Sequence, residues 1–462
     1  MRLLSTLSAV CLMGNAAHAI QLDIDSEQSV KDAASTIAFG LVSFYTGNNT
    51  GDVPGNLPDP YFWWTAGAMF GTLVDYWFLT GDDTYNDITT QAMVHQAGDE
   101  ADFMPLNQTR TLGNDDQGFW TLSAMMATEA GYPDPPADQP QWLALVQACF
   151  NQWAQRWIEA SDSCGGGLRW QIFSFNNGFN YKNSISNGCF FNIAARLARY
   201  TGNQTYAEWA ERVWDWEVKA GLITDEFKVY DGVEVVENSP DCPKIDKNQW
   251  SYNTGIYLHG AAVMHNVTGD DKWRTRTVGL LDETEKTFFQ NGVMFEQRCE
   301  PFKQCNIDQS SFKGYLARWM AGTAQVVPDL FDRIMGLLRP NAQSVASVCV
   351  GDPDQGFPGI GGTACGLAWQ PRGQFDGLVG VGEQMSALSA VMYTLVQKER
   401  TAPVTAQTGG TSKGNPQAGM EPHSWEFKPI QQAERVAAGF LTVGILTSLM
   451  AGVFFVMKEE TK

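Results

Sequence analysis

The sequence is poor in the residues that mark several common protein classes. It contains only five histidines, and 51 acidic against 31 basic residues give it a net charge of −20. No strongly basic segment interrupts this acidity, which argues against a nucleic-acid partner. His259 and His265 are six residues apart, so they do not form a ligand pair on one helical face. We therefore expect no metal and no other cofactor.

Several familiar catalytic motifs are also missing. The sequence has no Walker loop, no nucleophile-elbow serine and no zinc-ligand helix motif. The glycine-rich segment 377–382 does not follow a strand–helix unit, so it predicts a loop rather than a nucleotide site. These absences leave phosphoryl transfer, serine hydrolase chemistry and zinc peptidase chemistry poorly supported.

What the sequence has instead is a repeated phrase. An apolar segment containing one glycine is followed 14 residues later by a second glycine, a polar residue and another helical pattern. Each phrase predicts a helical hairpin, and internal repeats of this kind determine the fold. The glycine pairs are Gly67 and Gly81, Gly188 and Gly202, Gly255 and Gly269, with a looser copy at Gly118 and Gly131.

Six such hairpins can be counted. Their first helices are apolar around most of the circumference, which indicates burial, whereas the second helices are amphipathic. Six inner and six outer helices predict an all-α fold, an (α/α)6 toroid with loops at one mouth. An open helical array is the alternative, but the terminal hairpins lack the polar face that capping repeats need. The predicted first helices begin near Trp63, Asp115, Ser186, Tyr252, Ser311 and Glu383.

All inner helices of such a toroid start at the same mouth, where their unpaired N–H groups converge. The residues at these starts and in the loop before one of them are rich in aromatic rings and amides. Aromatic faces stack on sugars and amides hydrogen-bond to hydroxyl groups, so we expect a neutral, hydroxyl-rich ligand. The predicted binding residues are Trp63, Trp64, Asn114, Gln117, Trp170, Asn187, Trp250, Tyr252, Asn253 and Lys313.

One repeat carries two adjacent carboxylates, Asp115 and Asp116, at the start of its inner helix. An Asp-Asp pair at a helix start is usually a capping feature. This pair faces the mouth, however, and two carboxyl groups about 5 Å apart are the apparatus of a retaining glycosidase. So close together they cannot both ionise easily, and one can act as nucleophile while the other holds a proton. A buried structural role for the pair, with a site elsewhere, is the alternative.

The ends of the chain resemble targeting and membrane segments. Residues 1–19 have a positive start, an apolar stretch and the small-residue sequence Ala17-His18-Ala19, which predicts a signal peptide. Residues 20–400 form the predicted domain and 401–435 a flexible linker. Residues 436–457 carry no charge and predict either a single-pass helix or a removable glycolipid-anchor signal, with 458–462 as a short tail. Either reading places the domain outside the cell or in the lumen of the secretory pathway.

Secretion changes the interpretation of the cysteines and sequons. Eight cysteines remain after signal removal, which favours disulfide bonds. Closeness in sequence suggests Cys299–Cys305 and Cys349–Cys365. Four sequons predict glycosylation, at Asn48, Asn107, Asn203 and Asn266.

At these residues the chain resembles the fungal members of the endo-α-1,6-mannanase glycosidase family (family 76). The resemblance rests on the signal segment, the hairpin pattern, the motif Gly113-Asn114-Asp115-Asp116-Gln117 and the C-terminal apolar segment, and it covers about residues 20–400. It implies an (α/α)6 toroid, Asp115 as nucleophile, Asp116 as acid/base, retention of configuration and no cofactor.

The resemblance also implies a substrate class, α-1,6-linked mannose, and a role in fungal cell-wall biogenesis. The fungal members are thought to act on the glycan of glycolipid-anchored proteins and to transfer those proteins to wall glucan. A non-catalytic carbohydrate-binding wall lectin built on the same toroid is the rival hypothesis, since the aromatic residues would serve it equally well.

Overall fold

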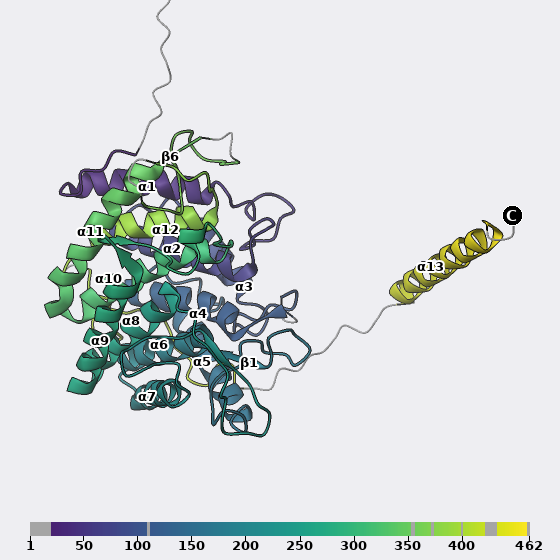
Figure 1. The fold of residues 1–462 in the computed structure, drawn as a ribbon, viewed down its shortest axis with the longest axis horizontal. Helices are drawn as coiled ribbons and strands as arrows, with labels where there is room; N and C mark the ends of the chain where they lie inside the picture. Colours follow the sequence, from purple (N-terminus) through teal and green to yellow (C-terminus); the bar gives the residue numbers. More distant parts are fainter. Residues whose placement is uncertain are drawn as a thin grey trace, which may run out of the picture. The chain divides into compact units, whose positions relative to one another are not determined.

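The computed structural model describes residues 20–108, 111–352, 356–370, 374–398, 401–420 and 432–459. The chain consists of two compact units, a body that extends to Met420 and a C-terminal unit that begins at Glu421. The predicted signal peptide lies outside the described residues. In the described part of the body, twelve α-helices form the fold, with three small antiparallel sheets between them (Figure 1).

Six of these helices form a closed inner ring. Each contacts the next in chain order, and the last contacts the first, so the predicted toroid is confirmed and the open array is excluded. The helices start close to the predicted positions. They are α2 (Trp63–Thr80), α4 (Asn114–Ala130), α6 (Ser184–Thr201), α8 (Ser251–Thr268), α10 (Phe312–Val326) and α12 (Val381–Met392).

The other six helices lie outside this ring. Five follow their inner partners as predicted: α3 (Asn86–Gln96), α5 (Trp142–Glu159), α7 (Gln204–Lys219), α9 (Asp271–Phe288) and α11 (Phe331–Val348). The sixth inner helix, α12, packs instead against α1 (Glu27–Val42), the first helix of the chain. The ring is therefore closed by joining the two ends of the domain.

Both glycines of the repeated phrase have a structural reason. The second ends the inner helix in the left-handed region, as at Gly81 with φ 78° and Gly202 with φ 73°, where a side chain would be strained. The first allows neighbouring inner helices to approach. A Cβ at Gly67 would lie 2.8 Å from the Trp120 ring, and one at Gly118 would lie 2.6 Å from the sulfur of Cys189.

Short strands and 3-10 helices occupy the connections. Strands β1 (Tyr181–Asn183), β2 (Gly232–Glu234) and β3 (Ile245–Asp246) form one antiparallel sheet in that order, with Asn183 opposite Gly232. Two further pairs are β4 (Phe289–Gln290) with β5 (Val293–Met294) and β6 (Cys349–Gly351) with β7 (Ala364–Cys365). The 3-10 helices include η2 (Glu300–Phe302), η3 (Gln309–Ser311), η4 (Pro328–Leu330) and η6 (Tyr393–Leu395).

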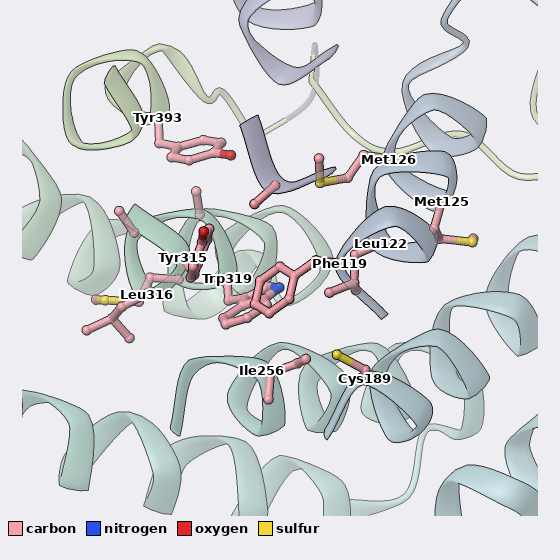
Figure 2. Close-up of a cluster of buried hydrophobic side chains, with 14 of the residues drawn as sticks. Phe119, Leu122, Met125, Met126, Cys189, Ile256, Tyr315, Leu316, Trp319 and Tyr393 are labelled. Carbon is pink, nitrogen blue, oxygen red and sulfur yellow. The ribbon is translucent and has the colours of Figure 1, made fainter. Parts of the chain in front are cut away.

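The lumen of the ring is filled by side chains. Phe119, Tyr315 and Trp319 meet in its centre (Figure 2). The ring centroids of Phe119 and Tyr315 are 5.0 Å apart, and those of Tyr315 and Trp319 are 6.0 Å apart. Below them, two buried ion pairs, Arg318 with Asp75 and Arg196 with Glu129, line a small pocket between the inner helices. Because the centre is closed in this way, the toroid is a bowl with one open mouth rather than a pore.

Residues 401–420, which were predicted to belong to a flexible linker, are hydrogen-bonded to helices of the body. The Val404 N–H donates to the Glu129 carbonyl at 2.8 Å, and the Ala406 N–H donates to the Tyr200 carbonyl at 3.0 Å. Farther on, the Asn151 amide donates to the Ala418 carbonyl at 2.8 Å. The segment is poor in large apolar residues, but its backbone hydrogen bonds attach it to the body.

The C-terminal unit contains α13 (Gln432–Glu459). Its stretch Arg435–Val453 has a mean hydropathy of 2.0 and is long and apolar enough to cross a membrane. The predicted membrane segment 436–457 falls within this helix.

Three disulfides cross-link the body. Cys299–Cys305 and Cys349–Cys365 confirm the predicted pairs, and Cys164–Cys242 adds a third. The other two cysteines of the body, Cys149 and Cys189, are buried and form no disulfide.

The predicted sequons differ in what their side chains do. Asn48, Asn107 and Asn203 are exposed in turns or at a helix start, where a glycan has room. The Asn266 amide nitrogen, to which a glycan would attach, donates instead to the Val326 carbonyl at 3.1 Å.

Candidate active site

The open mouth of the bowl leads into a cavity of about 580 Å³. Phe119, at the top of the filled lumen, forms part of its wall. The cavity is therefore bounded below by the packed core and above by the loops that precede the inner helices. Its lining residues are Phe62, Trp63, Trp64, Gln108, Thr111, Leu112, Asp115, Asp116, Phe119, Trp170, Gln171, Tyr181, Asn183, Asp231, Tyr252, Asp308 and Phe312.

The acid pair lies in this cavity, in the first turn of α4. Gly113 caps the helix with an extended backbone, and its N–H donates to the Asp116 carboxylate at 2.6 Å. The Asp116 N–H donates to the Asp115 carboxylate at 3.1 Å, and the Asn183 amide donates to the other Asp115 oxygen at 3.2 Å. The helix start and the end of β1 thus hold both carboxyl groups.

Burial dominates the electrostatics of this pair. It raises the pKa of Asp115 to about 7, against the opposing hydrogen bond from Asn183. Burial, followed by the adjacent Asp115 charge, raises the pKa of Asp116 well above its usual value. Near neutral pH, one of the two carboxyl groups can therefore keep a proton.

Two further carboxyl groups face the cavity. Burial raises the pKa of Asp231, which accepts a 2.7 Å hydrogen bond from the Tyr181 hydroxyl. Burial also raises the pKa of Asp308 to about 6, and one oxygen of Asp308 has no hydrogen-bond partner. Among the lining residues that the structure describes, four are acidic and none is lysine or arginine.

Four of the predicted binding residues line the cavity, and all four are aromatic: Trp63, Trp64, Trp170 and Tyr252. Trp63 is anchored by a 2.7 Å hydrogen bond from its ring N–H to Gln96, and Tyr252 stacks on Phe312 with centroids 3.8 Å apart. Trp170 is 38% exposed. These rings present apolar faces to the cavity.

The predicted amides and the lysine are placed differently. Asn114, Gln117, Asn187 and Lys313 are buried and are absent from the cavity lining. Asn187 bonds to both backbone groups of Leu168, at 2.7 Å and 3.0 Å. Lys313 donates to the Leu367 carbonyl at 2.6 Å and pairs with Glu300 at 2.7 Å. They therefore fix loops rather than contact a ligand, because each polar group already has a protein partner.

The last two predicted residues lie behind Asp231. Trp250 packs edge-on against Phe312, and Asn253 is buried on α8. Both side chains act on the Asp231 carboxyl group and lower its pKa against the effect of burial. Neither lines the cavity.

Sequence reasoning missed the part of the site contributed by loops and by the small sheet. Asp231 precedes β2, and its pairing with the β1 region is fixed by the Ser184 N–H, which donates to the Asp231 carbonyl at 2.8 Å. Asp308 precedes η3. Neither belongs to a repeated phrase, and only the backbone pairing places Asp231 beside Asn183. The lining residues that were not among the predicted site residues are Phe62, Gln108, Thr111, Leu112, Phe119, Gln171, Tyr181, Asn183, Asp231, Asp308 and Phe312.

Within the described residues, no group of three or more histidine, cysteine or acidic side chains is arranged to hold a metal ion. The described lining of the cavity combines four carboxyl groups with aromatic walls.

Residues 29–407 match the model of glycosyl hydrolase family 76. The chain belongs to this family. It is therefore a glycosyl hydrolase in fold and lineage, and the expected resemblance is confirmed.

Curated relatives match this family 76 chain over almost its whole length. It is 47% identical over 438 residues to the mannan endo-1,6-alpha-mannosidase DCW1 of Saccharomyces cerevisiae, covering 94% of each chain. It is 41% identical over 449 residues to the mannan endo-1,6-alpha-mannosidase DFG5 of the same yeast, covering 96% of this chain and 95% of the relative.

Solved structures agree on the fold. The crystal structure of Dfg5 from Chaetomium thermophilum in complex with glucosamine has a TM-score of 0.80 and 45% identity, covering 87% of this chain and 98% of that one. An α-1,6-mannanase of Salegentibacter, solved with α-1,6-mannotriose as an inactive variant with two consecutive aspartates replaced, has a TM-score of 0.59 and 16% identity. It covers 79% of this chain and 99% of that chain. At this identity it supports the fold alone.

Proposed function

We propose that this protein is a retaining glycosidase that cleaves α-1,6-mannosidic linkages in the fungal cell wall. The observation that carries the proposal is the pair of adjacent carboxyl groups with raised pKa in an aromatic cavity. The names of the 47% and 41% identical yeast relatives support the linkage and the sugar.

Each aspartate has a role that its surroundings favour. Asp115, whose carboxylate accepts a hydrogen bond from the Asn183 amide, is the ionised partner and attacks the anomeric carbon. Asp116 donates its proton to the departing glycosidic oxygen. In the second step Asp116 takes a proton from the incoming hydroxyl group, which attacks the glycosyl–Asp115 ester and restores the original configuration.

The charge of the cavity indicates the kind of glycan it accepts. The four carboxyl groups of the cavity disfavour a sulfated or phosphorylated sugar at the reaction centre, because like charges would be brought together in a poorly solvated space. A neutral mannosyl chain, or one that carries a free amine as glucosamine does, suits this lining.

A direct test is the replacement of the nucleophile. Asp115→Asn should abolish turnover of α-1,6-mannan oligosaccharides while leaving the circular dichroism spectrum and melting temperature unchanged or improved. Asp82→Asn, in the turn before α3, is the control and should retain full activity. Mass spectrometry of an adduct formed with a fluorinated mannosyl substrate should identify Asp115 as the labelled residue. Full activity of Asp115→Asn would refute the proposal. A wild-type protein that binds mannan but cleaves no bond would refute it as well.

The acceptor of the second step can be water or a sugar. We propose transfer to wall glucan, with the glycan of glycolipid-anchored proteins as donor. The exposed aromatic rings of Phe62 and Trp170 at the mouth offer stacking surfaces for a second glycan. Product analysis with added glucan oligomers should then reveal transfer products at the expense of hydrolysis.

We propose that the body acts on the outer or luminal side of the membrane, with α13 retained as a membrane-spanning helix. Its length and mean hydropathy support this assignment. An epitope tag appended after Lys462 should remain on the mature protein; loss of the tag would instead indicate exchange of the C-terminus for a glycolipid anchor.

A further inference from the structure

Arg156 contacts the two residues that flank the acid pair and is absent from the cavity lining. Arg156, in the last turn of the outer helix α5, extends its guanidinium group to the start of α4. It donates to the side-chain oxygens of Asn114, of Gln117 at 2.8 Å and of Gln152 at 3.0 Å. Asn114 and Gln117 immediately flank Asp115 and Asp116, so one cation holds both ends of the motif.

The side-chain amides of Asn114 and Gln117 also donate hydrogen bonds to backbone carbonyl groups of neighbouring loops. The Asn114 amide donates to the Arg169 carbonyl at 2.8 Å, and its backbone N–H donates to the Trp170 carbonyl at 2.8 Å. The Gln117 amide donates to the Asp102 carbonyl at 2.8 Å. Arg156 therefore stands at the junction of three segments that contribute to the cavity: the loop after Asp102, the start of α4 and the strand-like segment at Trp170.

The chemistry of arginine suits this position. Burial lowers the pKa of Arg156 to about 10, so the group is still a cation at neutral pH. A planar guanidinium presents several donors in a fixed fork and can bridge planar amide acceptors, whereas the ammonium group of lysine is a compact point donor. Lysine would keep the charge and lose the bridge between Asn114 and Gln117.

We propose that Arg156 is a positioning residue that holds the acid pair at its working geometry through Asn114 and Gln117. The inference rests on the proposed glycosidase function. A displacement of about 1 Å at a catalytic group can reduce the rate about 100-fold. Arg156 does not line the cavity, so its loss should act on the chemical step rather than on glycan binding.

The test compares Arg156→Lys with wild type on α-1,6-mannotetraose. We expect kcat to fall about 10- to 100-fold with KM changed less than about threefold, in a protein whose melting temperature shows it to be folded. Arg212→Lys is the matched control, because Arg212 lies on an outer helix and stacks over Trp209. It should leave both constants unchanged. Wild-type inactivity would refute the glycosidase proposal itself, whereas an active wild type with unchanged kcat in Arg156→Lys would refute only the positioning role.

A double-mutant cycle with Asn114→Ala tests whether Arg156 acts through Asn114. If Arg156 acts through Asn114, the two substitutions should be non-additive, with the double variant losing little more kcat than either single one. Fully additive losses would contradict the mechanism. If Arg156→Lys does not fold, Asn114→Ala alone should still lower kcat with little change in KM, and an unchanged kcat would overturn the proposal.

Discussion

At the scale of single residues, the acid pair is shaped by two opposing effects. The start of α4 favours negative charge, but the helix dipole contributes only about 0.3–1 kcal/mol. Burial between aromatic walls acts in the other direction and prevails, since it raises the pKa values of both aspartates. A pair of carboxyl groups that would be an ordinary cap at the surface thereby becomes a pair that holds a proton near neutral pH.

Asn183 provides a way to test this balance. Its amide donates to Asp115 and lowers the pKa of that carboxyl group, while its side-chain oxygen caps α6 by accepting from the Ser186 N–H. Asn183→Ser keeps an oxygen for the cap but removes the amide nitrogen that donates to Asp115. The pKa of Asp115 should rise above about 7, so the acidic limb of kcat/KM against pH should move upward by about 1 pH unit.

The control for this measurement is Asn180→Ser, in the exposed segment just before β1. Its pH profile should match that of the wild type. An acidic limb of Asn183→Ser that stays in place, or moves to lower pH, would show that Asn183 does not stabilise the ionised nucleophile.

The residues predicted from sequence divide by chemical type. The acids and most of the predicted aromatic residues line the cavity, because an inner helix start must face the mouth. The predicted amides Asn114, Gln117 and Asn187 do not line it, since they hydrogen-bond to backbone groups and to Arg156. A helix start exposes several directions at once, and the sequence pattern does not tell which side chain turns to the cavity and which to the wall.

At the scale of elements, the repeated phrase predicted the starts of four inner helices, α2, α4, α6 and α8, almost to the residue. It succeeded because each of its glycines has a local cause. The first lies where two inner helices are in close contact, and the second ends the helix in the left-handed region. The pairing of α1 with α12 and the docking of residues 401–420 were not predictable in this way. Both depend on contacts between distant parts of the chain that have no local pattern.

Gly118 of α4 tests the close helix contact. In Gly118→Ala, the new Cβ would lie 2.6 Å from the Cys189 sulfur and 2.8 Å from its Cβ. Such overpacking typically costs about 1–3 kcal/mol, and it would press on the helix that carries the acid pair. We expect a lower free energy of unfolding and a reduced kcat, measured by denaturant titration and by mannan hydrolysis.

Gly336 provides a control of opposite sign. It lies on α11, where an added Cβ meets nothing within 4 Å. Gly336→Ala should stabilise the protein by about 0.5–1 kcal/mol, because alanine loses less backbone entropy in a helix. Equal effects of the two substitutions would show that inner-helix contact is not what requires glycine at 118.

At the scale of the whole molecule, the catalytic body depends on segments far apart in sequence. The cavity combines helix starts, the β1–β2–β3 sheet and the loop that carries Asp308. The Cys164–Cys242 disulfide ties the segment after α5 to the segment between β2 and β3, across a sequence separation of 78 residues. This bond thus constrains the part of the chain that supplies Asn183 and Asp231.

The disulfides allow a quantitative prediction about this lobe. Chain-entropy reasoning assigns about 4 kcal/mol to a cross-link that closes a loop of this length and about 2 kcal/mol to one that closes six residues, as Cys299–Cys305 does. The double variant Cys164→Ser with Cys242→Ser should therefore lose about twice the free energy of unfolding lost by Cys299→Ser with Cys305→Ser.

Because the loop closed by Cys164–Cys242 includes β1 and β2, loss of this disulfide should also inactivate the enzyme at a temperature below that of global unfolding. Activity and circular dichroism measured on the same samples would show the difference. Equal destabilisation by the two pairs, or inactivation that coincides with unfolding in both, would mean that the sheet is held by its own packing rather than by the cross-link.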